Sequence, residues 1–557
     1  MNSDRSPFIQ IILLCAAILF LGQALHEPPN PRAITKSDIA GAEAIAGLSF
    51  TPAERDSMLG GLVDRRASFE RLRKLTLSNN IPPAILFNPV PAGATFDHVR
   101  KPFEMSAPQT LAVPANLEGL AFASVGELSA LIKSRKVTSV QLTTMYLNRL
   151  KRYGPKLLCV VTLTEDLALA QAKRADDELA AGKYRSPLHG IPYGVKDLLS
   201  TKGIKTTWGS VPYKDQIFDE NATVVRRLEE AGAVLLAKLS LGELAWGDVW
   251  FGGMTRNPWN IEEGSSGSSA GSASATAAGL VGFAVGTETW GSIVSPSTRC
   301  GTTGLRPSYG RVSRAGAMAL SWSMDKIGPI CRTVEDCALV FNAIYGPDGV
   351  DATVVDLPFN YSPRVSLKNV RIGYVKADFD TAHENRANDS LTIATLRNLG
   401  AQLVPIQLPA IPVNDISFIL DAEAGAAFDE LTRSGKDDLL VRQIKDAWPN
   451  AFRSSRFIPA VEYIQANRVR YLVIQQMASI MKEVDVYLAP SLEGDNVLLT
   501  NLTGHPSVVL PNGFTGKGTP TSITFTGQLY GEAMLLAVAK QYQDATDFHR
   551  KHPKLDF

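Results

Sequence analysis

The amino-acid sequence predicts an α/β protein built on a largely buried β-sheet. Amphipathic helical segments alternate with short continuous apolar runs, such as VLLAK (234–238) and VDVYLA (484–489). Such runs are typical of strands that are covered on both faces. The same alternation recurs over residues 371–410, and helix-capping signals precede several helical segments. With 557 residues, of which 45% are hydrophobic, the chain is long enough to enclose a large core.

Residues 1–25 are expected to act as a signal peptide. Arg5 precedes an apolar-rich run of fourteen residues, 8–21, which is shorter than the roughly 20 residues of a membrane-spanning helix. Residues 22–24 (GQA) offer a small-x-small cleavage site. Export to the periplasm or the medium is therefore expected. The alternative is an uncleaved N-terminal membrane anchor, since the run can be extended to Leu25.

Residues 26–122 are expected to form an N-terminal extension that packs on the main domain, although a flexible export linker is the alternative. A helix is predicted over 52–75, because Thr51 can cap it, Pro52 suits its first position and Glu54 completes a capping box. Residues 80–122 are rich in Pro, Gly and Ala, which predicts an irregular strap.

The main domain is expected over residues 123–557. Ser124 and Glu127 form a second capping box, which predicts a helix to about Ser134. Further helices are expected after Thr138 and over 165–181. Another is expected after Asn221, which is taken as its N-cap.

The charge balance gives no reason to expect nucleic acid as a partner, because the net charge is +1. The sequence has five cysteines, an odd number, and no CxxC motif, so neither a disulfide framework nor a zinc site is expected. Only His549 and His552 are close enough in sequence to share a metal, and they fall in a charged tail. No metal or cofactor is therefore predicted.

The residues expected to take part in a chemical reaction are Lys196 and residues of the stretch 264–292. This stretch holds seven Gly, seven Ser and six Ala, and it runs into the apolar segment LVGFAV, so we expect it to be packed rather than flexible. Upstream, the apolar segment GIPYGVKD (190–197) delivers a single lysine, Lys196. Serines held against a lysine in apolar surroundings are suited to nucleophilic catalysis.

Five motifs together resemble the amidase signature family, hydrolases with a Ser–cis-Ser–Lys triad. They are GIPYGVKD (190–197), GSSAGSASATAAG (267–279), GTETWGSI (286–293), CGTTGLRPSYGRVS (300–313) and SWSMDKIGP (321–329). The resemblance runs from about Ala123 to the C-terminus. It implies a large mixed β-sheet covered by helices on both faces. It also implies Ser292 as nucleophile, Ser268 as bridging serine after a cis peptide bond, and Lys196 as general base.

Lys196 can act as a base only when neutral, so its pKa must fall from about 10.4 towards neutrality. Burial without a carboxylate partner would achieve this. The neighbouring Asp197 is given a structural role, because adjacent residues of a strand point to opposite faces.

The loop before the nucleophile is expected to form the oxyanion hole through the backbone N–H groups of Thr289, Trp290, Gly291 and Ser292. This loop departs from the common family pattern GTDTGGSIR at Glu288, Trp290 and Val294. A positive φ at Trp290 would be strained, and its indole could instead narrow the acyl pocket. The family arginine is missing at Val294, so Arg299 is proposed to pair with Glu288.

Three alternative functions remain open. The segment GSSAG (267–271) also fits the GxSxG nucleophile elbow, which would make Ser269 the nucleophile and requires a preceding strand. RNPWNIEEGSS is instead expected to be turn-like. Within the family, the alternative is the A-type subunit of a glutamine-dependent amidotransferase, and a catalytically silent relative is the third. The predicted substrate is a small-molecule or peptide amide of unspecified structure.

Overall fold

The computed structural model describes residues 32–107 and 111–557. The chain divides into two compact units, the first ending at Leu77 and the second running from Ser78 to Phe557. The signal peptide or membrane anchor expected over residues 1–25 lies outside the described residues. In the described part of the chain, no helix is both long and apolar enough to cross a membrane.

The first unit contains two helices, α2 (Lys36–Ala46) and α3 (Pro52–Leu72). The capping box of α3 forms as its sequence indicates, with Thr51 and Glu54 exchanging side-chain and backbone hydrogen bonds and Pro52 at the start. No residue of α3 is buried.

The strap, defined here as residues 78–122, belongs to the second unit. Its described residues hold few regular elements, apart from the 3₁₀ turn Leu117–Leu120. The backbone N–H of Lys101 donates to Asn360 Oδ1 over 2.8 Å, and that of Glu104 donates to the Tyr361 carbonyl over 3.0 Å. The Phe87 ring lies edge-on to Tyr309, with 5.0 Å between ring centroids. The strap is therefore held to the main domain by specific contacts.

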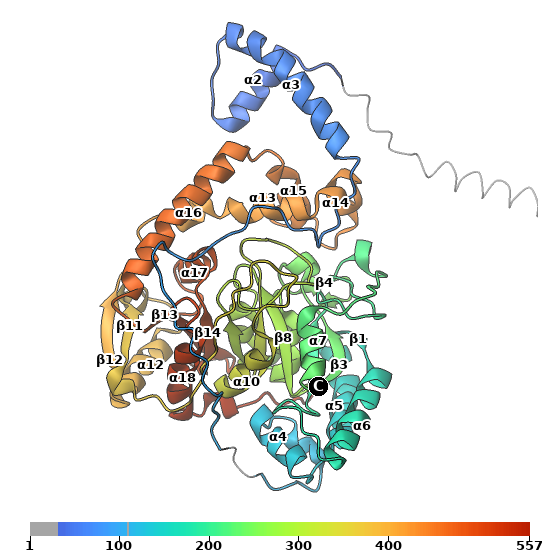
Figure 1. Cartoon of the computed structure of the whole chain (residues 1–557), viewed down its shortest axis with the longest axis vertical. Coiled ribbons are helices and arrows are strands. Elements are labelled where there is room, and N and C mark those ends of the chain that lie inside the picture. The colour runs from blue at the N-terminus through green and yellow to red at the C-terminus, as the bar shows by residue number, and fades with distance from the viewer. Residues whose placement is uncertain (1–31, 108–110) are drawn as a thin grey trace, which may run out of the picture. The chain divides into compact units, whose positions relative to one another are not determined.

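The second unit is built on one sheet of eleven strands, which confirms the predicted α/β class. Strands β1 and β3 lie at one end of this sheet and β11 and β12 at the other (Figure 1). In spatial order the strands are β1 (Val160–Leu163), β3 (Val234–Leu239), β2 (Pro192–Lys196), β8 (Phe283–Glu288), β10 (Lys326–Cys331), β9 (Thr303–Arg306), β14 (Ser507–Phe514), β15 (Pro520–Gly527), β13 (Val486–Pro490), β11 (Arg371–Val375) and β12 (Gln402–Ile406).

The sheet is mixed, as expected. Strand β2 is parallel to both β3 and β8, and β11 is parallel to both β12 and β13, whereas the intervening pairs are antiparallel. Every residue of β2, β3 and β8 is buried, which explains why these strands read as continuous apolar runs rather than as alternating ones.

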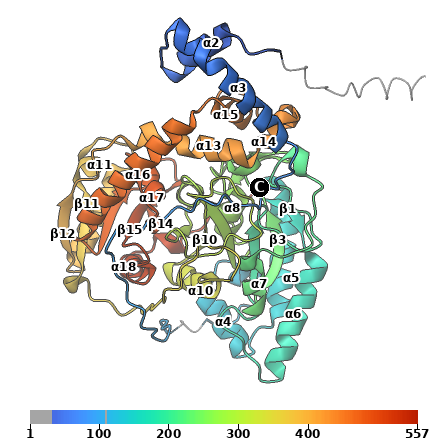
Figure 2. The ribbon, with the colours of Figure 1, turned by 45° about the horizontal axis from the view of Figure 1, so that its top comes forward.

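Two groups of helices cover the sheet. In the first group, α5 (Ser139–Leu157) and α6 (Glu165–Ala180) lie side by side in both views (Figures 1 and 2), and α8 (Ala270–Ala277) and α9 (Val294–Cys300) continue the layer. In the second group, α10 (Val334–Ile344) packs against its neighbours. The neighbours of α10 are α4 (Val125–Lys133), α7 (Thr223–Glu230) and α18 (Glu532–Asp544). Helix α12 (Arg386–Asn398) packs against α18.

The remaining helices follow β11 or lie beyond β12 in sequence. Of these, α13 (Phe418–Ala427) packs against both α15 (Trp448–Ser455) and the long α16 (Ala460–Met481), and α17 (Asn496–Thr503) contacts α16. The short helices are α11 (Lys376–Asp380) and α14 (Asp429–Arg433).

Two local expectations were wrong. Asn221 does not cap α7, whose N-cap is Ala222; its side chain instead accepts a hydrogen bond from Lys202 N over 2.8 Å. The segment RNPWNIEEGSS contains the strands β6 (Arg256–Asn257) and β7 (Asn260–Gly264), which pair as a separate hairpin outside the main sheet. Asn257 accepts from Trp259 N over 3.1 Å and so closes the tight turn between them.

Candidate active site

Lys196 lies at the carboxyl end of β2, with its side chain fully buried. Its amine donates to Ser268 Oγ over 2.8 Å, to Thr287 Oγ1 over 2.8 Å and to Ser269 Oγ over 3.1 Å. A longer contact of 3.4 Å reaches the Thr287 carbonyl. Among the described residues, no carboxylate bonds to this amine. Its partners are all neutral oxygens.

This environment lowers the pKa of Lys196 to about 7. Burial is the main cause, because it disfavours the charged ammonium, and the more distant carboxylates of Asp325 and Glu288 oppose it only in part. An amine with a pKa near 7 is present as the free base in a substantial fraction at neutral pH. That is the condition for a general base.

Asp197 points away from this amine, as expected for the next residue of the strand. Its carboxylate pairs with the buried Lys238 ammonium over 3.0 Å, and it accepts hydrogen bonds from Thr207 N over 2.9 Å and Thr207 Oγ1 over 2.5 Å. Lys238 therefore neutralises Asp197, and the carboxylate does not hold Lys196 in its charged form.

Ser268 lies just before α8, and the peptide bond between Gly267 and Ser268 is cis. Glycine is required at position 267, because a Cβ there would lie 1.8 Å from the Gly247 carbonyl oxygen. A Cβ at Gly286 on β8 would likewise lie 2.7 Å from Ser269 Oγ. These two glycines let the start of α8 approach the sheet closely enough for its serines to reach Lys196.

Ser292 lies in the turn between β8 and α9, and it is 8% exposed. Its carbonyl accepts a hydrogen bond from Ser269 N over 3.2 Å, which ties the turn to the start of α8. In the part of the chain that the structure describes, its hydroxyl forms no hydrogen bond, not even with Ser268. Of the predicted relay, the Lys196–Ser268 link is therefore formed. The Ser268–Ser292 link is not closed in this structure.

The proposed oxyanion loop offers unpaired donors. Among the described residues, the backbone N–H groups of Thr289, Trp290, Gly291 and Ser292 form no hydrogen bond to a protein acceptor. The positive φ of this loop, +86°, falls on Gly291 and not on Trp290, so tryptophan is accommodated without the strain considered from the sequence. The Trp290 side chain is 42% exposed.

Glu288 anchors this loop from the end of β8. Its Oε2 accepts hydrogen bonds from Ile293 N over 2.8 Å and Val294 N over 2.9 Å. Its Oε1 contacts the buried Arg306 over 2.7 Å and Asn501 Nδ2 over 2.8 Å. Although burial raises its pKa, the Arg306 charge and these hydrogen bonds lower the pKa of Glu288 to about 2. The carboxylate is therefore ionised at every pH at which the protein would be assayed.

The proposed pairing of Glu288 with Arg299 is wrong. Arg299 lies on the outer side of α9, with its side chain 51% exposed, and contacts Glu263 over 3.2 Å. Glu288 is buried, so its partner has to come from within the sheet, and Arg306 on β9 meets that requirement. The sequence offered this arginine in the motif GLRPSYGRVS, but spacing along the chain did not indicate which arginine faces Glu288.

The Glu288–Arg306 pair predicts a measurable coupling. Breaking a buried ion pair typically costs about 3–5 kcal/mol because one charge is left uncompensated. Glu288→Gln and Arg306→Met are each expected to reduce the free energy of unfolding by about that much, and the double variant by clearly less than the sum. Urea unfolding measures all three. Arg299→Met is the control, with an expected loss below about 1 kcal/mol; a Glu288–Arg306 coupling near zero would refute the pairing.

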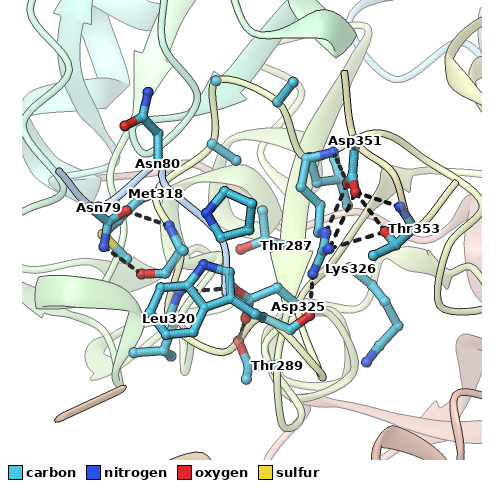
Figure 3. A pocket seen from close by; sticks show the side chains of 18 of the residues that line it. Asn79, Asn80, Thr287, Thr289, Met318, Leu320, Asp325, Lys326, Asp351 and Thr353 are labelled. Atoms are coloured by element: carbon cyan, nitrogen blue, oxygen red, sulfur yellow. Dashed lines mark hydrogen bonds and ion pairs between the residues drawn. The ribbon is translucent and has the colours of Figure 1, made fainter. Parts of the chain in front are cut away.

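Thr287, which sequence analysis did not single out, connects Lys196 to a cavity. It bonds Lys196 through its hydroxyl, and together with Thr289 it lines a cavity of about 180 Å³ (Figure 3). Asp325 lies beside them, and its carboxylate accepts from Thr289 Oγ1 over 2.5 Å. Thr287 and Thr289 are two residues apart at the end of a strand and so face the same side, a signal that could have found them.

Ser269 is placed as a structural residue rather than as a nucleophile. It is fully buried, its hydroxyl donates to the Thr287 carbonyl over 2.9 Å and accepts from Thr287 N over 3.1 Å. The strand β7 that precedes it belongs to the separate hairpin and not to the main sheet, so the strand–turn–helix of a nucleophile elbow is not formed. A nucleophile elbow also works with a histidine that follows it in the chain. One such histidine, His505, is buried beside Thr503, and burial lowers its pKa to about 3.

Comparisons with known proteins identify the family. The sequence model of the Amidase family matches residues 141–495. The A-type subunit of the glutamyl-tRNA(Gln) amidotransferase from Coxiella burnetii is 34% identical over 481 residues, covering 78% of this chain and 99% of the relative. The corresponding protein of Roseiflexus sp. is 35% identical over 467 residues, covering 75% of this chain and 96% of the relative.

Solved structures show the same fold. An amidase family protein from Bacillus anthracis superposes with a TM-score of 0.70 at 30% identity, covering 79% of this chain and 93% of that protein. The peptide amidase from Stenotrophomonas maltophilia gives a TM-score of 0.69 at 29% identity, covering 79% and 99%. The chain therefore belongs to the amidase signature family and is an enzyme that acts on carbon–nitrogen bonds.

Proposed function

We propose that the protein is an amide hydrolase that works through an acyl-enzyme on Ser292, with Ser268 as the bridging hydroxyl and Lys196 as the general base. One observation carries this proposal: a fully buried amine with a pKa near 7 donates to Ser268 and has only neutral oxygens as partners. The buried Lys238 differs, because its amine is paired with the Asp197 carboxylate, which favours the charged form.

The chemistry begins when Ser292 Oγ attacks the amide carbonyl carbon. Its proton passes to Ser268, whose own proton passes to the neutral Lys196 amine. The carbonyl oxygen becomes an oxyanion, which the N–H groups of 289–292 bind in this mechanism. As the C–N bond breaks, Lys196 returns a proton through Ser268 to the leaving nitrogen. Water then attacks the ester carbonyl carbon and gives a proton through Ser268 to Lys196. As the ester C–O bond breaks, Lys196 returns that proton through Ser268 to Ser292 Oγ, which releases the carboxylic acid and regenerates Ser292.

The open Ser268–Ser292 contact is compatible with this sequence of steps. Catalytic hydrogen bonds are often long or misaligned without substrate and tighten in the Michaelis complex. A change of the χ1 rotamer of either serine relocates its Oγ without movement of the backbone, and the hydrogen bond from Ser269 N to the Ser292 carbonyl already holds the two loops beside each other.

A panel of amides tests the proposal. We expect the purified chain alone to release ammonia from simple primary amides, and a fluorophosphonate probe to label Ser292, located by peptide mass spectrometry. Labelling of another serine would assign a different nucleophile. Absence of both hydrolysis and labelling would favour a catalytically silent relative.

The second candidate function is that of one component of an amidotransferase. It is favoured by the similarity to the A-type subunits of the glutamyl-tRNA(Gln) amidotransferases of two bacteria. The same panel of amides distinguishes the two functions. Ammonia release from glutamine only after addition of partner chains would favour the amidotransferase over the hydrolase.

A further inference from the structure

The cavity beside Thr287 has one wall that comes from the strap, outside the part of the chain matched by the family model, 141–495. Figure 3 shows Asn79 and Asn80 on one side of the cavity and Asp351 and Thr353 on the other, with Thr289 and Asp325 between them. The strap residues that line it are Asn79, Asn80, Pro82, Pro83, Ile85 and Leu86; this set, residues 79–86, is called the pocket segment.

Asn79 fastens the pocket segment to two parts of the main domain. Its Nδ2 donates to the Ala319 carbonyl over 2.9 Å and to the Ala427 carbonyl over 3.3 Å, and its Oδ1 accepts from Ala319 N over 2.7 Å. The pair with Ala319 mimics a rung of a β-ladder. Pro82 and Pro83 follow at once and restrict the backbone that leads to the lining residues. The pocket segment is thus fastened at Asn79, whereas Ile85 and Leu86 at its other end are largely exposed.

The charged groups of the cavity lining already have protein partners. Arg314 pairs with Asp351 over 3.0 Å and donates to the Trp322 carbonyl over 2.7 Å. Asp325 accepts from Leu320 N over 2.8 Å and Ser321 N over 3.0 Å, besides the Thr289 hydroxyl. Lys326 donates to the Met324 carbonyl. Burial and the nearby Arg306 hold the pKa of Lys326 well below its usual range.

The free surface of the lining is mainly apolar, with Ile85, Leu86, Met318, Leu320 and Trp322 among its members. Its volume of about 180 Å³ exceeds the roughly 150 Å³ of an apolar protein cavity that binds benzene. A group with one aromatic ring therefore fits and leaves little space for a second, linked ring. An amino acid substrate would have to bury its ammonium and carboxylate groups in this cavity without new partners, which weakens its binding.

We propose that this cavity is the acyl pocket, that the pocket segment closes it, and that it selects an uncharged acyl group the size of a single phenyl ring. The inference rests on the proposed function, because it requires that the carbonyl group of the bound acyl group lies next to Ser292, on the far side of Thr289. It assigns a role in substrate selection to a segment that precedes the matched family region.

The test compares acetamide, benzamide, biphenyl-4-carboxamide and glutamine as substrates of the full chain, with Asn79→Ala and a matched control. We expect kcat/KM to be highest for benzamide, at least tenfold above biphenyl-4-carboxamide and glutamine. Asn79→Ala should reduce the benzamide to biphenyl-4-carboxamide ratio at least fivefold, mainly through KM. The control is Asn88→Ala, an asparagine of the same strap that lies outside this cavity and whose side chain, among the residues described, bonds only Val90 N; its ratio should stay within twofold of wild type.

A second measurement separates the pocket from the chemistry. Calorimetric titration of benzamide into the Ser292→Ala protein should show binding that weakens at least fivefold when Asn79→Ala or the cavity-filling Ala317→Leu is added. Binding with this dependence but no hydrolysis by wild type would overturn the proposed function and retain the pocket assignment. Hydrolysis with ratios unaffected by Asn79→Ala, or a preference for glutamine, would overturn the pocket assignment alone.

Discussion

Replacing Ser292 by alanine is expected to lower kcat by at least about 10³-fold on any amide that the wild type hydrolyses. The reason is that no acyl-enzyme can form without its hydroxyl, and what remains is the rate enhancement from binding and from the N–H groups of the loop. The fold should be retained, because in the described structure this hydroxyl makes no hydrogen bond that would be lost. Steady-state kinetics with thermal unfolding of the same preparation measures both effects.

Ser295→Ala provides a matched control for this prediction. Ser295 lies in α9, three residues after Ser292, and is only partly buried. We expect its kcat to stay within about threefold of wild type. If Ser292→Ala keeps a comparable rate, or still reacts with a fluorophosphonate, the nucleophile lies elsewhere and the proposed mechanism is wrong.

Replacing Lys196 by methionine is the second large effect. A general base contributes about 10²–10⁴-fold to a rate, and a loss in that range is expected in kcat. Methionine matches the length of the lysine side chain and removes a polar group that is fully buried. The melting temperature should therefore not fall, and it should rise most at low pH, where wild type must bury an ammonium ion.

The pH profile gives Lys196 an independent signature. Because the amine acts as base only when neutral, kcat/KM of the wild type should rise with pH through an inflection near 7 and then level off. Below that value the amine is protonated and the rate falls tenfold per pH unit. In Lys196→Met the residual activity should lack this inflection. A wild-type profile that is flat between pH 5 and 9 would contradict the assignment of Lys196 as base.

The sign of the stability effect follows from the same pKa. The pKa of Lys196 is about 7 when folded and about 10.4 in an unfolded chain. Between these values the unfolded state binds more protons, so stability rises with pH across that interval. Below pH 7 the buried Lys196 ammonium lowers the free energy of unfolding by its full amount. A comparison of wild type with Lys196→Met by urea unfolding at pH 6 and pH 9 would reveal it.

Local sequence patterns predicted the elements that bear the chemistry. Continuous apolar runs marked β2, β3 and β13, since strands buried on both faces need no polar alternation. Capping boxes marked the starts of α3 and α4, since they act within four residues. The family motifs placed Lys196 and Ser268, and the structure brings these two side chains within 2.8 Å.

Contacts between distant segments were not predictable in the same way. Glu288 meets Arg306 and Asn501, which come from other strands and helices, and nothing in the spacing favours them over the closer Arg299. Asn79 and Ala319 are separated by 240 residues. The hairpin of β6 and β7 was missed because β6 has only two residues and β7, with the sequence NIEEG, contains no apolar run.

Lys196 ends strand β2 and Ser292 follows strand β8, and these two strands are direct neighbours in register, with Val195 opposite Val285. The backbone hydrogen bonds of the sheet therefore hold these two strands beside each other, and substitutions at the protein surface leave this arrangement in place. The strap, in contrast, touches the cavity from outside this framework. Substrate preference could consequently be re-engineered by exchanging a few strap residues, while the reacting groups keep their places.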